Sequence, residues 1–141
     1  MAKVLRIDHV AILVEDLEAT LGFWRDALGM DLAQVKEMPA EMAEIAFLPT
    51  QGSEVELVRP TTPGSGLARY LEKRGPGMHH LCLEVDDLVG MLAQLKAAGV
   101  QLINEEPRLG DGGKRYAFIH PKSANGVMVE LYEYPAAGAP R

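Results

Sequence analysis

Four residues of this chain have the chemistry of divalent-metal ligands, and they occur as two matched pairs. His9 and His80 are separated by 71 positions (80 − 9), and Glu56 and Glu130 are separated by 74 (130 − 56). Imidazole nitrogens favour transition metals, whereas carboxylates also accept harder ions. Neither pair contains a thiolate, so the set does not suit a cysteine-rich structural zinc site. We therefore predict a metal site with mixed nitrogen and oxygen ligands.

Both pairs belong to a two-fold internal repeat. The offset of 71 also relates Val14, Asp16 and Leu17 to Val85, Asp87 and Leu88, and Ala46-Phe47 to Ala117-Phe118. The offset of 74 relates Gly52 and Val55-Glu56-Leu57 to Gly126 and Val129-Glu130-Leu131. A loop of different length explains the change of offset, because loops tolerate insertions. The repeat selects His80 rather than His79, and Glu56 rather than Glu54.

Each half of the repeat predicts one strand, one helix and three further strands. In the first half we expect strands at 4–14, 31–36, 44–49 and 53–59, with a helix that Asp16 opens and Gly29 ends. In the second half we expect strands at 80–85, 101–104, 114–119 and 127–132, with a helix from Asp86 to Gly99. Because a half of about 60 residues is marginally stable alone, the two halves should share one core. The pattern predicts an α+β fold of two βαβββ modules related by a pseudo-two-fold axis.

The chain is 141 residues long, the length of one domain. We expect a single domain over 1–135, with modules at 4–60 and 78–135, a connector at 61–77 that carries a helix at 67–74, and a flexible tail at 136–141. Hydrophobic residues make up 48%, enough for a substantial core.

Composition also excludes several classes of partner. The formal net charge of −6 argues against nucleic acid, because binding to the phosphate backbone needs a basic face. The mean hydropathy of −0.02, without an apolar run of about 18 residues, argues against a membrane span. The single cysteine, Cys82, and the lack of a signal-peptide pattern predict a reducing, cytoplasmic location.

Several motifs together resemble a known family. They are Ile7-Asp8-His9-Val10-Ala11, Glu56–Pro60, Leu71–His80, Glu105–Gly110, His120–Ser123 and Gly126–Leu131. This set resembles the vicinal oxygen chelate (glyoxalase) superfamily and, within it, the methylmalonyl-CoA epimerase family, over nearly the whole chain to Pro135. The resemblance implies an open half-barrel around one divalent metal held by His9, Glu56, His80 and Glu130. It favours Co²⁺, with Mn²⁺, Mg²⁺, Ni²⁺ and Zn²⁺ as alternatives.

The activity that this resemblance implies is metal-dependent epimerisation of methylmalonyl-CoA between its (2R) and (2S) forms. An α-proton is removed, an enolate forms, and the metal stabilises the negative charge on the thioester oxygen. Two carboxylates are candidates for proton transfer. Glu130 is one, since a monodentate metal ligand keeps a free oxygen. Glu44 is the other, because alternation places it on one strand face with Ala46 and Leu48, and we expect that face to line the cavity.

One departure from the family concerns the segment before Glu44. Family members often have Glu-Gln-Gly there, whereas this chain has Ala40-Glu41-Met42-Ala43. The loop beside the expected base is thereby altered. The preference between methylmalonyl and ethylmalonyl groups therefore stays open at this point.

The expected partners are an acyl-CoA substrate and a second copy of the chain in a homodimer. Lys114, Lys122 and Arg74 are candidates to bind the CoA phosphates. Three other functions are alternatives: a glyoxalase acting on a glutathione hemithioacetal, a metal-free small-molecule-binding protein, and an extradiol-type dioxygenase. The binding protein would not need the paired His and Glu residues, and the dioxygenase would use only two His and one Glu.

Overall fold

The computed structural model describes residues 1–136 and divides into two compact units. His9–His79 form the N-terminal unit, and Met1–Asp8 together with His80–Arg141 form the C-terminal unit. The tail expected at 136–141 lies, from residue 137 onward, outside the described residues. Each unit is described separately below.

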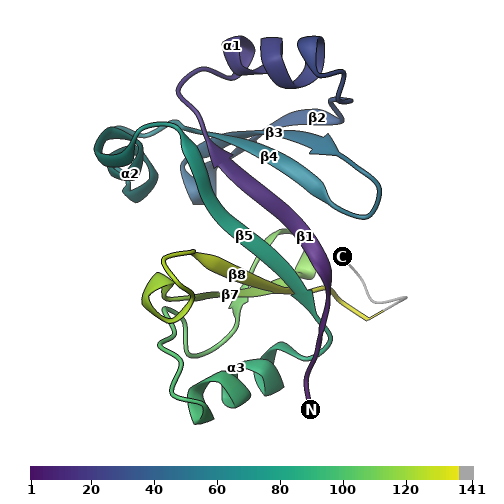
Figure 1. Ribbon diagram of the computed structural model, residues 1–141, viewed down its shortest axis with the longest axis vertical. Coiled ribbons are helices and arrows are strands. Elements are labelled where there is room, and N and C mark those ends of the chain that lie inside the picture. Colours follow the sequence, from purple (N-terminus) through teal and green to yellow (C-terminus); the bar gives the residue numbers. More distant parts are fainter. Residues whose placement is uncertain (137–141) are drawn as a thin grey trace. The chain divides into compact units, whose positions relative to one another are not determined.

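The N-terminal unit contains the strand and helix pattern predicted for the first module. Its elements are the second half of β1 (Val4–Leu13), α1 (Leu17–Leu21) continued by a π-helical turn (Gly22–Ala27), β2 (Gln34–Met38), β3 (Ala43–Pro49), β4 (Glu54–Pro60) and α2 (Gly66–Arg74) (Figure 1). Asp16 caps α1, because its carboxylate accepts a hydrogen bond from the Ala19 amide at 3.1 Å. Gly29 follows with a positive φ of 84°, which glycine adopts without strain.

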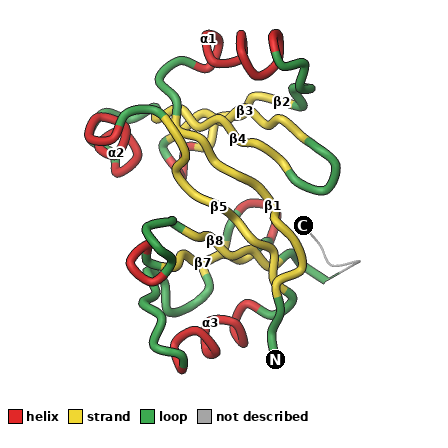
Figure 2. The backbone as a smooth tube through the Cα atoms, viewed as in Figure 1, coloured by secondary structure: helices red, strands yellow, loops and turns green. Residues whose placement is uncertain are grey.

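The C-terminal unit repeats this order. It contains most of β5 (Gly77–Val85), α3 (Leu88–Ala97), β6 (Arg108–Leu109), β7 (Arg115–Ile119) and β8 (Val129–Glu133) (Figure 2). Strands follow the order β2-β3-β4-β1 in the first unit and β6-β7-β8-β5 in the second. In both, the last strand pairs in parallel with the first, and the other pairs are antiparallel. The predicted α+β fold of two βαβββ modules is confirmed.

One predicted strand is wrong. Residues 101–104 form only an isolated bridge, between Leu102 and Ile119, and the edge strand is β6 instead. The reason lies at Asn104, whose side-chain oxygen accepts the hydrogen bond from the Phe118 amide at 2.8 Å. A side chain thus takes the place of a backbone acceptor, and the regular ladder is interrupted.

The N-terminal sheet buries apolar side chains on both faces. On one face, Leu17 and Leu21 of α1 pack against Ala46, Leu48 and Leu57. This packing follows from alternation, because successive residues of a strand point to opposite faces.

On the opposite face, α2 contributes Leu67, Tyr70 and Leu71, which pack against a cluster that includes Leu13 and Ile45. Ser65 caps this helix by accepting a hydrogen bond from the Ala68 amide at 3.1 Å. The two faces of this sheet are therefore distinguished by the helix that covers each.

In the C-terminal unit, α3 covers one face of the sheet. Leu88 and Leu92 pack against Ala117 and Leu131 there. Asp87 caps α3 through a hydrogen bond from the Gly90 amide at 3.0 Å, as Asp16 caps α1. Within the described residues, no helix is long and apolar enough to cross a membrane.

Truncation of the N-terminal core should lower stability measurably. Leu57 is fully buried between β4 and α1, so Leu57→Ala should lower the free energy of unfolding by about 2–5 kcal/mol. Urea denaturation followed by circular dichroism measures this change. The control is Val89→Ala at a position that is 55% exposed, where the change should stay within about 0.5 kcal/mol. Equal effects of the two substitutions would contradict the assignment of this core.

Candidate metal centre

The N-terminal unit brings together the first predicted His–Glu pair. His9 comes from β1 and Glu56 from β4, two strands that pair in parallel with Ala11 opposite Glu56. The Nδ1 atom of His9 lies 3.3 Å from Oε2 of Glu56. Both residues are buried, His9 to 1% exposure and Glu56 to 9%. The pairing of the strands thus places an imidazole and a carboxylate side by side in a partly dehydrated environment.

The C-terminal unit brings together the second pair. His80 comes from β5 and Glu130 from β8, and Nε2 of His80 lies 3.1 Å from Oε1 of Glu130. In the parallel register Cys82 lies opposite Glu130, so both side chains share a sheet face with His80. The ring of Phe118 meets the His80 ring edge to face, with centroids 5.7 Å apart. That contact restricts the orientation of the imidazole.

The chemistry of these residues fits a divalent cation. Burial of a carboxylate is costly unless a charge, a hydrogen bond or a metal compensates it. Among the described residues, the buried charged or polar ones are Asp8, His9, Glu56 and Glu130, so three of the four predicted ligands belong to this small group. Neutral imidazole and ionised carboxylate are the ligand forms that first-row divalent metals accept. Each unit therefore presents one imidazole and one carboxylate that could bind such a cation.

Glu44 lies on the other face of the N-terminal sheet, which corrects the expectation that it lines the cavity with the metal ligands. The expected alternation is observed, because Glu44 shares its face with Ala46 and Leu48. That face, however, is the one that α1 covers. Register across β1, β4 and β3 puts His9 and Glu56 on the opposite face.

The contacts of Glu44 explain its position. Its Oε1 accepts hydrogen bonds from Nε and Nη2 of Arg59, at 3.1 and 3.0 Å. Arg59 is its direct cross-strand neighbour on β4. The β3 residues that share a face with Glu56 are Ala43, Ile45 and Phe47, and all of them are apolar. Strand β3 thus offers no carboxylate to the His9–Glu56 face.

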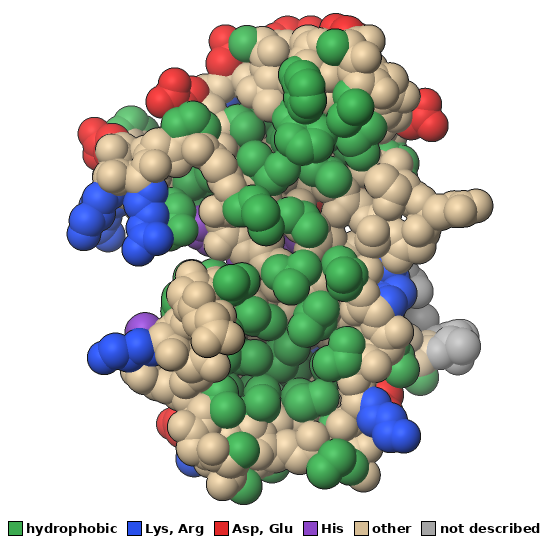
Figure 3. Space-filling model, viewed as in Figure 1, with side chains coloured by type: hydrophobic (Ala, Val, Ile, Leu, Met, Phe, Trp, Pro, Cys, Tyr) green, Lys and Arg blue, Asp and Glu red, His purple; other side chains and the backbone are tan. Residues whose placement is uncertain are grey.

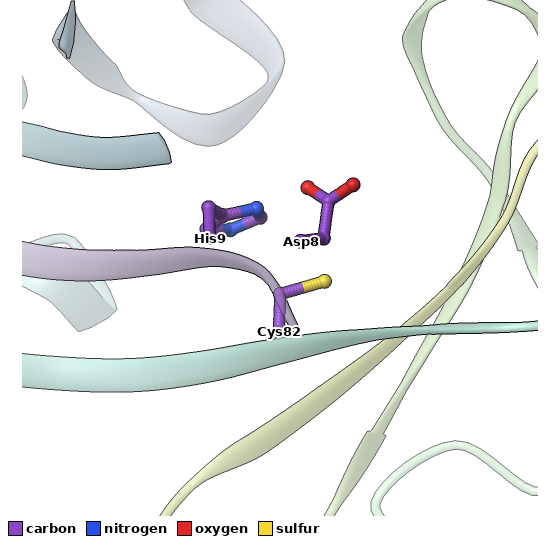
Figure 4. A group of neighbouring side chains, drawn as sticks. All are labelled: Asp8, His9 and Cys82. Atoms are coloured by element: carbon purple, nitrogen blue, oxygen red, sulfur yellow. The ribbon is translucent and has the colours of Figure 1, made fainter. Parts of the chain in front are cut away.

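A buried carboxylate that the motif analysis did not single out is Asp8. It accepts a hydrogen bond from the Tyr134 hydroxyl at 2.5 Å and pairs with Arg6 at 3.0 Å. Burial and this hydrogen bond raise the pKa of Tyr134 above its usual value. Asp8 and Cys82 lie side by side, from β1 and β5, with ligand atoms within 4.8 Å (Figure 4). The signal in the sequence was an acidic residue in a mainly apolar strand, directly before His9.

The three basic residues predicted to contact CoA occupy different elements. Arg74, at the end of α2, lies over the Tyr70 ring at 5.1 Å from its centroid. With Arg69 and Lys73 it belongs to the exposed basic surface of α2, blue in Figure 3. Lys114 precedes β7 and lies over the Tyr132 ring at 4.6 Å. Lys122 is exposed in a short 3₁₀ turn.

The loop before β3 carries Met42 where members of the family often have glycine, and the backbone conformation at this residue is unusual. Met42 adopts the left-handed conformation, with φ 54° and ψ 44°. An L-residue other than glycine pays roughly 1–2 kcal/mol for this conformation. The backbone here has therefore the shape that glycine favours, although the chain carries methionine.

Comparison with known proteins identifies extensive similarity. Residues 8–118 match the model of the Glyoxalase/Bleomycin resistance protein/Dioxygenase superfamily. The ethylmalonyl-CoA/methylmalonyl-CoA epimerase of Cereibacter sphaeroides is 38% identical over 128 residues, which are 89% of this chain and 96% of that protein. The match thus extends over most of both proteins.

Solved structures give the same result. A methylmalonyl-CoA epimerase in complex with methylmalonyl-CoA and NH₄⁺ superposes with a TM-score of 0.84 at 32% identity, covering 98% of this chain and all of the other. The methylmalonyl-CoA epimerase of Mycobacterium tuberculosis gives 0.83 at 37% identity, with 94% and 89% coverage. Similarity therefore extends from the sequence to the full course of the backbone.

The affinity for Co²⁺ should distinguish His80, a proposed metal ligand, from Glu44, which lies on the other sheet face. Loss of a residue that only supports a metal ligand already costs about 10–100-fold in affinity, so His80→Ala should weaken Co²⁺ binding at least tenfold. Glu44→Gln should leave it within about twofold, because Glu44 lies on the α1 face. Isothermal titration calorimetry measures both. A loss of affinity in Glu44→Gln comparable to that in His80→Ala would contradict the face assignment.

Proposed function

This chain belongs to the methylmalonyl-CoA epimerase family of the glyoxalase superfamily, and on that premise we propose that it interconverts the (2R) and (2S) forms of methylmalonyl-CoA. The observation that carries the proposal is the pair of buried His–Glu contacts, one in each unit, at equivalent positions of the repeat. Family membership supplies the acyl-CoA substrate class. The His–Glu pairs supply the ligand chemistry that such a reaction uses.

We propose that one divalent cation is held jointly by His9, Glu56, His80 and Glu130. Two observations support this proposal. The repeat relates His9 to His80 and Glu56 to Glu130, and within each unit the histidine lies close to the glutamate. A cation bound there would act as a Lewis acid toward the negative charge that develops on the thioester oxygen. Co²⁺ is the preferred candidate, with Mn²⁺, Mg²⁺, Ni²⁺ and Zn²⁺ as alternatives.

Proton transfer is the task that remains for the side chains. The C-terminal unit offers Glu130, buried and 3.1 Å from His80, and a carboxylate that binds through one oxygen keeps the other for a proton. Such a positioned acid or base typically contributes about 10²–10⁴-fold to the rate. Because Glu44 lies on the α1 face, we assign no proton transfer to it.

The nucleotide end of the substrate requires cationic contacts. We propose Arg74 and Lys122 for the CoA phosphates, since both are exposed. Arginine suits phosphate particularly well, because its planar guanidinium donates two parallel hydrogen bonds. The buried thiol of Cys82, the single cysteine of the sequence, accords with a reducing cytoplasm, which we propose as the location.

Proton exchange at the α-carbon tests the proposed reaction. Protein loaded with Co²⁺ and incubated with (2R)- or (2S)-methylmalonyl-CoA in deuterated water should incorporate deuterium and interconvert the two forms. Removal of the metal with a chelator should abolish exchange, and added Co²⁺ should restore it. NMR and chiral analysis of the acyl group provide the measurement.

Two variants refine this test. Glu130→Gln should lower the exchange rate at least about 100-fold, whereas Glu44→Gln should retain it. The absence of exchange in the metal-loaded protein would disprove the proposal. Isomerisation of a glutathione hemithioacetal under the same conditions would instead favour the glyoxalase alternative.

We also propose a homodimer, the assembly that the family resemblance implies. The initial segment of β1 exposes Val4, Leu5 and Ile7 to about half of their surfaces, and exposed apolar patches mark interaction surfaces. Size-exclusion chromatography with light scattering should give about twice the chain mass of 15.4 kDa. Leu5→Glu together with Ile7→Glu should shift the population to monomer. A monomeric wild-type protein would contradict the dimer.

A further inference from the structure

An aromatic strip leads away from the His80–Glu130 pair on the same face of the C-terminal sheet. Phe118 lies opposite Glu130 on neighbouring strands, and Tyr116 lies opposite Tyr132 one step further along. Edge-to-face contacts join the His80 ring to Phe118 and Phe118 to Tyr116, with centroids 5.7 and 6.0 Å apart. Because Glu130 and Tyr132 are two residues apart, they lie about 7 Å apart along the strand.

At the end of the aromatic strip away from His80, the ammonium group of Lys114 lies over a tyrosine ring. The Nζ atom of Lys114 lies over the Tyr132 ring, 4.6 Å from its centroid, and the residue is partly buried. Lys114 is placed there by the turn between β6 and β7, in which the Gly110 amide donates to the Lys114 carbonyl at 2.8 Å. A Cβ atom at Gly110 would lie 3.2 Å from the Tyr116 ring and 3.4 Å from Cγ of Lys114. This turn therefore packs closely against the two side chains.

Arg108, opposite Tyr116 on β6, is exposed, and several other charged groups near this face have charged partners. Arg6 pairs with Asp8 at 3.0 Å and with Glu84 at 2.6 Å, and the Glu130 carboxylate lies beside His80. On the opposite face, Arg115 pairs with Glu133 at 2.6 Å. Lys114 makes no ion pair within the part of the chain that the structure describes, and its ammonium lies over the Tyr132 ring.

A partly buried ammonium without a carboxylate partner is suited to an anionic ligand. The Tyr132 ring attracts the cation through its electron-rich face. That attraction orders the side chain but does not neutralise its charge. The three N–H donors of the ammonium can therefore bind the oxygens of an anion.

We propose that Lys114, positioned by Tyr132, binds the negatively charged acyl end of the substrate and stabilises the charge that grows there as the α-proton leaves. This inference rests on the proposed function. It separates Lys114 from Arg74 and Lys122, and assigns it to the reacting end of the substrate rather than to the CoA phosphates.

The placement of Lys114 favours the acyl end. It shares a sheet face with Glu130 and lies over the tyrosine next to Glu130 on that face. In CoA thioesters the long pantetheine arm separates the phosphates from the thioester. A cation on the same sheet face as the proposed proton-transfer residue is therefore better placed for the acyl carboxylate or the developing enolate oxygen.

The experiment compares Lys114→Met with wild type on two substrates. Methionine keeps an apolar stem against Tyr132 but removes the charge. A hydrogen bond to a charged group contributes about 1.5–3 kcal/mol, so kcat/KM should fall about 10–100-fold for methylmalonyl-CoA. The same loss is expected for methylmalonyl-pantetheine, which has no nucleotide phosphates. Lys114→Arg should recover part of the loss.

Binding measurements separate this proposal from the proposed function. Calorimetric titration of metal-loaded protein with methylmalonyl-pantetheine should show weaker binding in Lys114→Met, even if wild-type protein catalyses no exchange. The affinity for propionyl-CoA, which lacks the acyl carboxylate, should change little.

The matched control is Lys96→Met. Lys96 is 67% exposed on its side chain and pairs with Glu105 at 2.8 Å, so its loss should leave both measurements unchanged. A Lys114→Met defect confined to the CoA ester would assign Lys114 to the phosphates and overturn the proposal. Indistinguishable behaviour of Lys114→Met and Lys96→Met would overturn it as well.

Discussion

The cost of removing charge from water governs this structure. His9, Glu56 and Glu130 are buried among apolar strands, although a carboxylate is rarely dehydrated without compensation. The compensation begins within each unit, where an imidazole lies within 3.3 Å of a carboxylate. A divalent cation would complete this compensation, because its positive charge would balance the carboxylates and it would accept the lone pairs of the imidazole nitrogens. Stability and ligand chemistry thus depend on the same contacts.

Strand parity is the second constraint, and it separates Glu56, a proposed metal ligand, from Glu44. A shift of one residue along a strand transfers a side chain to the opposite face. Glu56 therefore lies beside His9, whereas Glu44 lies under α1 with Arg59. The same parity places Phe118, Tyr116 and Lys114 on the sheet face of the His80–Glu130 pair. The two units consequently present different chemistry on equivalent faces, apolar along β3 and aromatic with a cation along β7.

Much of the architecture was predictable because the signals are local. Asp16 and Asp87 cap their helices through side-chain contacts three residues away, as their sequence context indicates. The strand at 101–104 could not be predicted correctly, since the competing hydrogen bond joins Asn104 to Phe118, 14 residues away. Similarly, the burial of Asp8 depends on Tyr134, which is 126 positions distant. Such partners carry no signal in the neighbouring sequence.

By itself, the sequence determined the repeat, the order of the elements and the four residues of the His–Glu pairs, because a duplicated pattern identifies equivalent positions without coordinates. Tertiary structure decided which sheet face each side chain occupies. Alternation along β3 groups Glu44 with Ala46 and Leu48, but only strand register and helix packing show that α1 covers this group. The physical reason is that periodicity defines two faces of a strand and leaves them equivalent. They become different only when other segments of the chain pack against them.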